Sequence, residues 1–172
     1  IPVLIQKIKS GINLGIVTDA GTPLISDPGY KLIQAALDEN IIVKSVPGPS
    51  ALTAAISISG ISSDQFLFLG FLPRKPTLRK YKIHSIAQIE ASIIIFESAH
   101  RINKLLKDLY LLLGNRKISV LREITKMYEE NIRGNISDVI EHCLSKTLKG
   151  ELVLVIEKAE NKKPEYSDEQ II

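Results

Sequence analysis

In the first third of the chain, hydrophobic positions alternate between short continuous runs and segments with helical spacing. The runs at residues 14–18 and 41–46 are short and apolar, which is typical of buried strands. Residues 3–10, 30–39 and 51–59 are apolar at helical spacing or throughout, which predicts helices. Because strand, helix, strand and helix alternate here, the pattern predicts parallel strands joined by crossover helices.

The rest of the chain has the pattern of a second α/β unit. Short apolar runs predict four strands, and longer segments with one apolar face predict two helices, each ended by a turn signal. The strands are expected at residues 66–72, 92–96, 118–122 and 152–156, and the helices at residues 99–113 and 136–146. Between the first two strands, the basic segment 73–82 is interrupted by proline and runs into a further helix.

The two units meet near residue 62, where a short linker separates them. We therefore expect an N-terminal α/β domain over residues 1–61, a C-terminal α/β domain over residues 62–160 and a polar tail over residues 161–172. A cleft between two such domains is a common place for a ligand, so we expect the binding site there.

Composition narrows the class of protein. The 172 residues are 45% hydrophobic but only 5% aromatic, without Trp, so the core must be aliphatic. The net charge of +3 is weak evidence for an anionic partner. Cys143 is the single cysteine, which excludes an internal disulfide and fits a cytoplasmic location. No apolar run is long enough to span a bilayer, and no His or Cys stands at ligand spacing, so we expect neither a membrane partner nor a metal.

The sequence GIVTDAGTPLISDPGY, residues 15–30, follows the first predicted strand directly. In open α/β sheets, ligands bind beyond the carboxyl ends of the strands. Ala20, Gly21 and Thr22 have little side-chain bulk, so a ligand can approach the main chain, and Asp19 can accept hydrogen bonds. A plain turn that joins strand to helix is an equally good interpretation of this stretch alone.

The sequence VPGPSALTAA, residues 46–55, repeats this arrangement after the second predicted strand. Pro47 and Gly48 interrupt the strand, and Ser50 and Ala51 stand at a helix N-terminus, which favours anionic or polar ligand atoms. A simple Gly-Pro helix start is the alternative. Neither loop matches the dinucleotide-binding or P-loop glycine patterns.

Two charged groups are candidates for chemistry in the second unit. FESAHRI places Glu97 and His100 at the end of a predicted strand, where they can transfer protons. A capped helix start with surface charges is the alternative. PRKPTLRKYK holds a dense group of cations that can contact phosphate, or else a solvated loop. These cations include Arg74, Lys75, Arg79 and Lys80.

Six motifs occur in an order that resembles a known family. They are VTDAGTPLISDPGY, VPGPSALTAAISISG, FLGFLPRK, FESAHRI, REITKMYEENIRG and KGELVLVIE. Together they resemble the bacterial 2′-O-ribose methyltransferases of small-subunit ribosomal RNA, a branch of the tetrapyrrole methylase superfamily. The resemblance covers roughly residues 14–157, nearly the whole chain.

This resemblance implies two α/β domains with S-adenosyl-L-methionine (SAM) in the cleft between them, and a homodimer. It implies methyl transfer to the 2′-hydroxyl of a cytidine in the decoding centre of 16S rRNA, on the small ribosomal subunit. By this resemblance, the cofactor loops correspond to two sets of residues, and Phe96 continues the pocket from the second domain. The two sets are Asp19, Ala20, Gly21 and Thr22, then Pro47, Gly48, Ser50 and Ala51. Because a ribose hydroxyl is a poor nucleophile, a base should assist this reaction, and His100 and Glu97 are the candidates among the residues present. The resemblance also favours the basic segment as an RNA contact.

Family members begin with a further strand and a Pro-Ile-Gly-Asn-Leu loop, whereas this chain begins at Ile1-Pro2. We therefore expect that the first strand and helix of the N-terminal domain are missing and that this piece alone binds SAM weakly or not at all. Two other functions stay open. One is a SAM-dependent methylase of a small molecule such as a corrin precursor, and the other is a non-catalytic remnant that binds a ligand or RNA.

Overall fold

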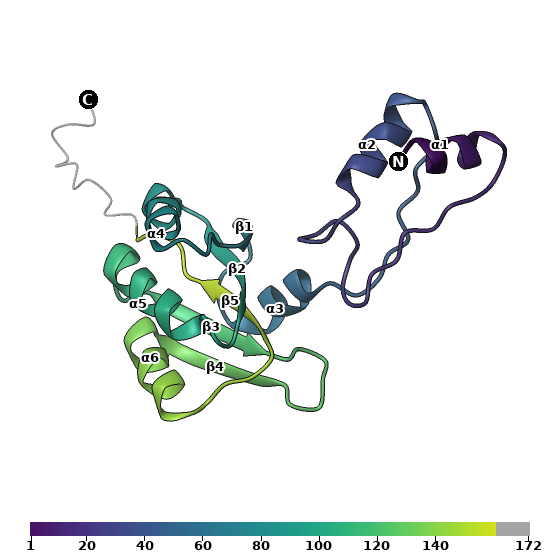
Figure 1. Ribbon diagram of the computed structural model, residues 1–172. Coiled ribbons are helices and arrows are strands. Elements are labelled where there is room, and N and C mark those ends of the chain that lie inside the picture. Colours follow the sequence, from purple (N-terminus) through teal and green to yellow (C-terminus); the bar gives the residue numbers. More distant parts are fainter. Residues whose placement is uncertain (161–172) are drawn as a thin grey trace, which may run out of the picture. The chain divides into compact units, whose positions relative to one another are not determined.

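The computed structural model describes residues 1–160, which divide into one unit over Ile1–Ala54 and a second from Ala55 onward (Figure 1). The expected polar tail over residues 161–172 lies outside the described residues. No helix within the described part is long and apolar enough to cross a membrane.

The first unit contains helices and extended segments. Its helices are α1 (Pro2–Lys9), α2 (Tyr30–Asp38) and the beginning of α3 (Ala51–Ser59), and they confirm the three helices predicted there. Apolar spacing builds α1 and α2, and a positive φ at Gly11 and at Asn40 follows each of them.

The strands predicted at residues 14–18 and 41–46 are wrong, and so is the parallel pairing between them. Both segments are extended, but neither forms ladder hydrogen bonds with any described segment. A strand exists only through a paired neighbour, and an apolar run without one leaves its side chains in solvent. Val17 is accordingly 90% exposed and Ile42 82% exposed.

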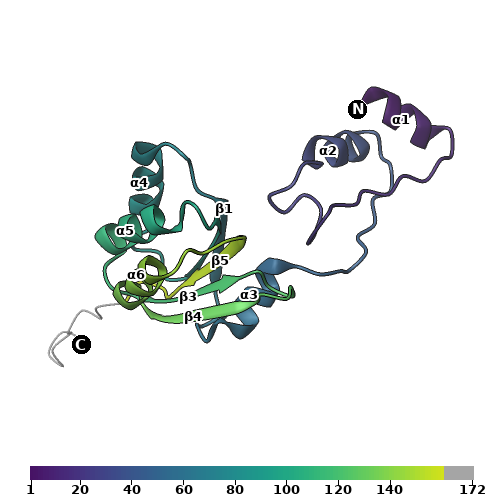
Figure 2. The ribbon, with the colours of Figure 1, turned by 60° about the horizontal axis from the view of Figure 1, so that its bottom comes forward.

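A five-stranded sheet in the order β1-β2-β5-β3-β4 forms the second unit (Figure 2). The β1–β2 pair is parallel and the other three pairs are antiparallel. Four strands confirm the prediction, while β4 was not expected because ENIRGN has no apolar alternation. The strands are β1 (Phe66–Phe71), β2 (Ser92–Ser98), β3 (Lys117–Arg122), β4 (Glu130–Asn135) and β5 (Glu151–Ile156).

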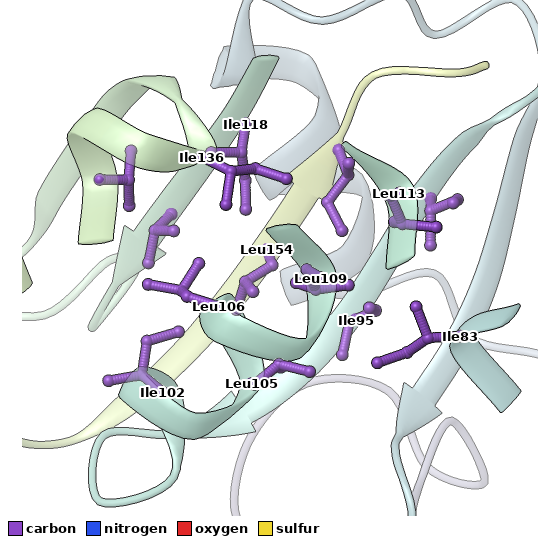
Figure 3. Packing of buried hydrophobic residues seen from close by; sticks show 14 of the residues in the cluster. Ile83, Ile95, Ile102, Leu105, Leu106, Leu109, Leu113, Ile118, Ile136 and Leu154 are labelled. Atoms are coloured by element: carbon purple, nitrogen blue, oxygen red, sulfur yellow. The ribbon is translucent and has the colours of Figure 1, made fainter. Parts of the chain in front are cut away.

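Helices α4 (Pro76–Ser85), α5 (Ile102–Leu113) and α6 (Ile136–Ser145) cover one face of this sheet (Figures 1 and 2). The two helices predicted at residues 99–113 and 136–146 are confirmed, but α5 begins three residues later, after a turn. Figure 3 shows the aliphatic core between helices and sheet, as the composition predicted. It is made of side chains such as Ile83, Ile95, Ile102, Leu105, Leu106, Leu109, Ile118, Ile136 and Leu154.

The C-terminal half of α3 lies against the opposite face of the sheet, where side chains of β4 cap it. Asn131 donates a hydrogen bond to the carbonyl of Ile58, and Arg133 donates to the carbonyls of Ile58 and Ser59. The last carbonyls of a helix have no partner inside the helix, so these bonds both satisfy them and hold α3 on the sheet.

Candidate functional site

The two glycine-containing loops of the first unit are joined to each other. The hydroxyl of Thr22 donates a hydrogen bond of 2.9 Å to the carbonyl of Pro49, across 27 positions of sequence. The structure therefore brings together the DAGT and PGPS loops that the sequence singled out separately. The segments that lead into them are extended chain and not paired strands.

The first of these loops is closed at its base by side chains. Thr18 donates a hydrogen bond of 2.8 Å from Oγ1 to Oδ2 of Asp27. Between them the chain turns sharply, with positive φ at Gly21, Leu24 and Ser26. A positive φ is strained for the two non-glycine residues, which is a common property of loops that serve a function. The high density of Gly, Pro and Asp in this stretch thus corresponds to a compact turn with a fixed shape.

Main-chain donors in this loop are available to a ligand. The backbone N–H groups of Ala20, Gly21 and Thr22 form no hydrogen bond with any described residue. A Cβ built on Gly21 or on Gly48 would meet nothing within 4 Å, so space lies beside the backbone of both loops. Asp19 is exposed beside these donors. The arrangement can bind polar or anionic ligand atoms through main-chain amides.

The second loop leads into α3. Pro47 and Gly48 are exposed, while Ser50 and Ala51 are half-buried. The carbonyl of Ser50 accepts hydrogen bonds from the backbone of Ala54 and from the hydroxyl of Thr53, whereas the Ser50 hydroxyl itself has no partner among the described residues. That hydroxyl and the free N–H groups of the first helical turn are further donors for a ligand.

In the second unit, Glu97 and Arg101 close the turn that carries His100. Oε1 of Glu97 accepts hydrogen bonds from the backbone and hydroxyl of Ser98, and Oε2 lies 3.3 Å from Nη2 of Arg101. The Glu97 side chain is buried, and Arg101 also donates to the carbonyl of Leu72 at 2.9 Å. His100 is exposed at the tip of the turn and has no side-chain partner among residues 1–160.

Phe96 immediately precedes this turn on β2. Its ring makes edge-on contacts with Phe68 and Phe71, with ring centroids 4.8 and 5.8 Å apart. Phe96 is half-buried, and Phe71 remains exposed. These rings form an aromatic strip across β1 and β2, on the face of the sheet that α4, α5 and α6 leave uncovered.

The basic segment is divided by the structure. Arg74, Lys75 and Lys80 are exposed, but Arg79 is buried in an ion pair with Asp108 of α5, at 2.6 Å. Nε of Arg79 also donates to the same carboxylate oxygen at 2.8 Å. Arg79 therefore does not belong to the exposed basic surface that we expected to include it. Asp108 was missed, although it is the only acid in an otherwise apolar and basic helix.

A second charged cluster lies where β3 ends and where β4 and β5 begin. Hydrogen bonds from the backbone of Glu151 and from Lys126 hold the pKa of Glu123 below its ordinary value. The same contact with Glu123, and a second one with Glu151, raises the pKa of Lys126. Burial alone raises the pKa of Glu130, but the hydrogen bond from Lys146 and nearby positive charges outweigh it, so that pKa is lowered. Each of these charges is satisfied by a neighbour, as in a structural network.

The family model of the tetrapyrrole (corrin/porphyrin) methylases matches residues 2–140, which include both joined loops and the Glu97–Arg101 turn. The chain belongs to the tetrapyrrole methylase family. Sequence relatives carry the name ribosomal RNA small subunit methyltransferase I. The relative from Halalkalibacterium halodurans is 40% identical over 154 residues, which is 90% of this chain and 53% of the relative. That from Hydrogenobaculum is 44% identical over 90% of this chain and 67% of the relative.

Solved structures of tetrapyrrole methylases share the fold. The methyltransferase CobJ matches with a TM-score of 0.68 at 15% identity, over 92% of this chain and 70% of that protein. A uroporphyrin-III C-methyltransferase from Thermus thermophilus, complexed with S-adenyl homocysteine, matches with a TM-score of 0.52 at 17% identity, over 78% of this chain and 62% of that protein. The chain spans 53–61% of the length of the first three sequence relatives.

Proposed function

We propose that the protein transfers a methyl group from SAM to the 2′-hydroxyl of a cytidine in the 16S rRNA of the small ribosomal subunit. The observation that carries this proposal is the pair of loops joined through Thr22 and Pro49, with free main-chain donors, in a chain 40% identical to a ribosomal RNA small subunit methyltransferase I. The cytidine and its 2′-hydroxyl come from the motifs that resemble the 2′-O-ribose branch. We also propose that the protein acts in the cytoplasm as a homodimer.

The residues present fit a cofactor with a carboxylate, hydroxyls and an adenine ring. We assign the free N–H groups of residues 20–22 and the hydroxyl of Ser50 to its polar groups, and Asp19 to its ribose hydroxyls or ammonium group. The open space at Gly21 and Gly48 lets such a ligand lie against the main chain, flanked by Pro47 and Ala51. From the resemblance, we also assign Phe96 of β2 to the cofactor. When bound, SAM supplies an electrophilic methyl group on a sulfonium.

His100 is the candidate base. A ribose hydroxyl is a poor nucleophile, so removal of its proton as the new carbon–oxygen bond forms assists the transfer. His100 is exposed and unpaired among the described residues, whereas Glu97 is committed to Arg101 and to Ser98. We propose that His100 accepts the proton of the ribose hydroxyl. Glu97 then stabilises the turn that carries His100. With SAM bound, the electron pair of the broken carbon–sulfur bond would go to sulfur and cancel its positive charge, so that the leaving group would be a neutral thioether.

The exposed cations Arg74, Lys75 and Lys80 are assigned to the RNA backbone. The hydrogen bond from Arg101 to the carbonyl of Leu72 holds the start of this segment on the sheet. Preorganised cations lose less conformational freedom when they bind a phosphate. Binding through them should weaken steeply as salt rises.

The test is transfer of labelled methyl from SAM to small ribosomal subunits that lack the modification, followed by nuclease digestion to locate the label. Because the chain spans about half the length of its relatives (53% of the first), the assay is run on this chain and on the longest reading frame that contains it. We expect label on one cytidine ribose, lost when Thr22→Val separates the two loops, and reduced at least about tenfold by His100→Ala. Bound SAM with no label would indicate a small-molecule substrate instead. No bound SAM would leave only a non-catalytic role.

A further inference from the structure

We propose that the outer surface of α4 and α5 is a binding surface for the phosphate backbone of RNA, formed by Lys80 together with Lys104 and Lys107 of α5. The inference rests on the proposed function and extends it to a helix that the basic segment of the sequence does not include. Lys104 and Lys107 lie within the sequence INKLLKDLYLLL. Its apolar pattern indicates a core helix and gives no sign that its two lysines bind a ligand.

The three lysines share one region of the surface. Nζ of Lys80 lies 3.7 Å from Oδ1 of Asp108, which places this α4 side chain over α5. Lys104 stands one helical turn before Asp108, and Lys107 stands three residues after Lys104. Residues three and four apart are neighbours on a helix surface, so Lys104 adjoins Asp108, which Lys80 reaches, and Lys107 adjoins Lys104. All three are exposed.

The two helices carry one acid, Asp108, against these three lysines. The segment Pro76–Ser85 contains no acid, and Asp108 is the only acid in Ile102–Leu113. Arg79 neutralises Asp108 inside the protein, with its Nη2 at 2.6 Å from the carboxylate. The buried pair thus does two things: it fixes α4 to α5, and it removes the one acid from the outer surface.

Two other lysines of this unit are paired with carboxylates. Lys126 is held by Glu123 and Glu151, and Lys146 is held by Glu130. By contrast, neither Lys104 nor Lys107 has a carboxylate within 4.0 Å among the described residues. Unpaired ammonium groups on two adjoining rigid helices suit phosphates, which Lys binds as a point charge without reading base sequence.

The experiment compares Lys104→Gln/Lys107→Gln with a control outside the basic segment, Lys117→Gln. Lys117 is also an exposed lysine without a carboxylate within 4.0 Å among residues 1–160, but it stands at the start of β3 and not on α4 or α5. Binding to small ribosomal subunits and to 16S rRNA stripped of protein is measured by filter binding between about 0.05 and 0.3 M salt. Circular dichroism confirms that each variant is folded.

We expect the double variant to bind at least about tenfold more weakly at 0.1 M salt, and the slope of log K against log salt to become shallower by about 1.5 to 2, for two lost phosphate contacts. Lys117→Gln should change neither quantity. An unchanged double variant, or an equal loss in the control, would overturn the surface, as would stronger binding of an acidic polypeptide such as polyglutamate than of RNA. A failure of the proposed function would give a different result. Neither the parent chain nor any variant would transfer a methyl group, while RNA binding would still depend on Lys104 and Lys107.

Discussion

Gly150 has no room for a side chain. It precedes β5 with φ at +93°, and a Cβ there would overlap the carboxylate of Glu123, which accepts hydrogen bonds from the backbone of Glu151 and from Lys126. We expect Gly150→Ala to lower the free energy of unfolding by about 2–3 kcal/mol, from backbone strain and from displacement of Glu123. Urea denaturation measures it. Gly114→Ala is the control, because Gly114 has a positive φ but open space, so a smaller loss is expected. Equal losses of unfolding free energy in Gly150→Ala and Gly114→Ala would show that displacing Glu123 does not destabilise the protein.

Glu123 also makes stability depend on pH. Its pKa in the folded protein is lowered from 4.5, first by the backbone hydrogen bond from Glu151 and then by Lys126. A lowered folded pKa gives stability that is fully present above the unfolded value and is lost as pH falls through the folded one. We expect Glu123→Gln to reduce the loss of stability between about pH 5 and pH 3. Glu141→Gln, at an exposed position of α6 without an ion pair among residues 1–160, should leave the slope unchanged. A parallel pH profile for both variants would refute the assignment.

Arg79 shows how a site residue can be misjudged from local composition. Among the cations of residues 73–82 it looks like one more surface charge, yet Arg79 and Ile83, four residues apart, form the buried face of α4, and Ile86 directly after the helix is buried too. Helical spacing was the available signal. Its partner Asp108 lies 29 positions away, so only the packing of two helices could identify the pair. The bond from Thr22 to the carbonyl of Pro49 is equally non-local.

At the level of elements, hydrophobic periodicity predicted those helices and strands whose formation depends on their own local sequence. All the predicted helices and four of the five strands of the sheet were found. In the second unit, helices α4, α5 and α6 and these strands have an apolar face that the core buries. Strand β4 was missed since its position depends on pairing with β3 and on holding α3, not on its own hydrophobicity. The runs at residues 14–18 and 41–46 have strand composition but no paired neighbour among the described residues.

Helix α5 is the element on which the core depends most. Leu106 is 0% exposed at its centre, against β5 and α6 side chains in Figure 3, whereas Leu111 on the same helix is 68% exposed. Leu106→Ala should therefore lower the free energy of unfolding by about 2–5 kcal/mol through lost burial and the cavity it leaves. Leu111→Ala should change it by less than about 0.5 kcal/mol. Thermal and urea unfolding of the two variants compare them directly. Similar losses would mean that α5 is not packed as described.

At the scale of the whole molecule, burial is unevenly divided between the two units. Within residues 1–54 the buried hydrophobic side chains are Ile5 and Ala36, whereas the second unit holds the sheet and its aliphatic core. Since burial of apolar surface is the main favourable term in folding, the second unit should be stable without the first. A fragment over residues 50–160 keeps all of α3 and the side chains of β4 that cap it.

We expect this fragment to unfold cooperatively, with a melting temperature within about 4–8 °C of the parent chain, the change that about 1 kcal/mol makes in a domain of this size. A peptide over residues 1–54 should show no cooperative transition. Limited proteolysis of the parent chain should cut before residue 50 first, because cleavage follows local opening and few buried contacts oppose it there. A fragment 50–160 that melts without cooperativity would mean that the first unit contributes to the stability of the second. In that case, substitutions in the two loops would have to be controlled for global unfolding before any loss of cofactor binding is assigned to them.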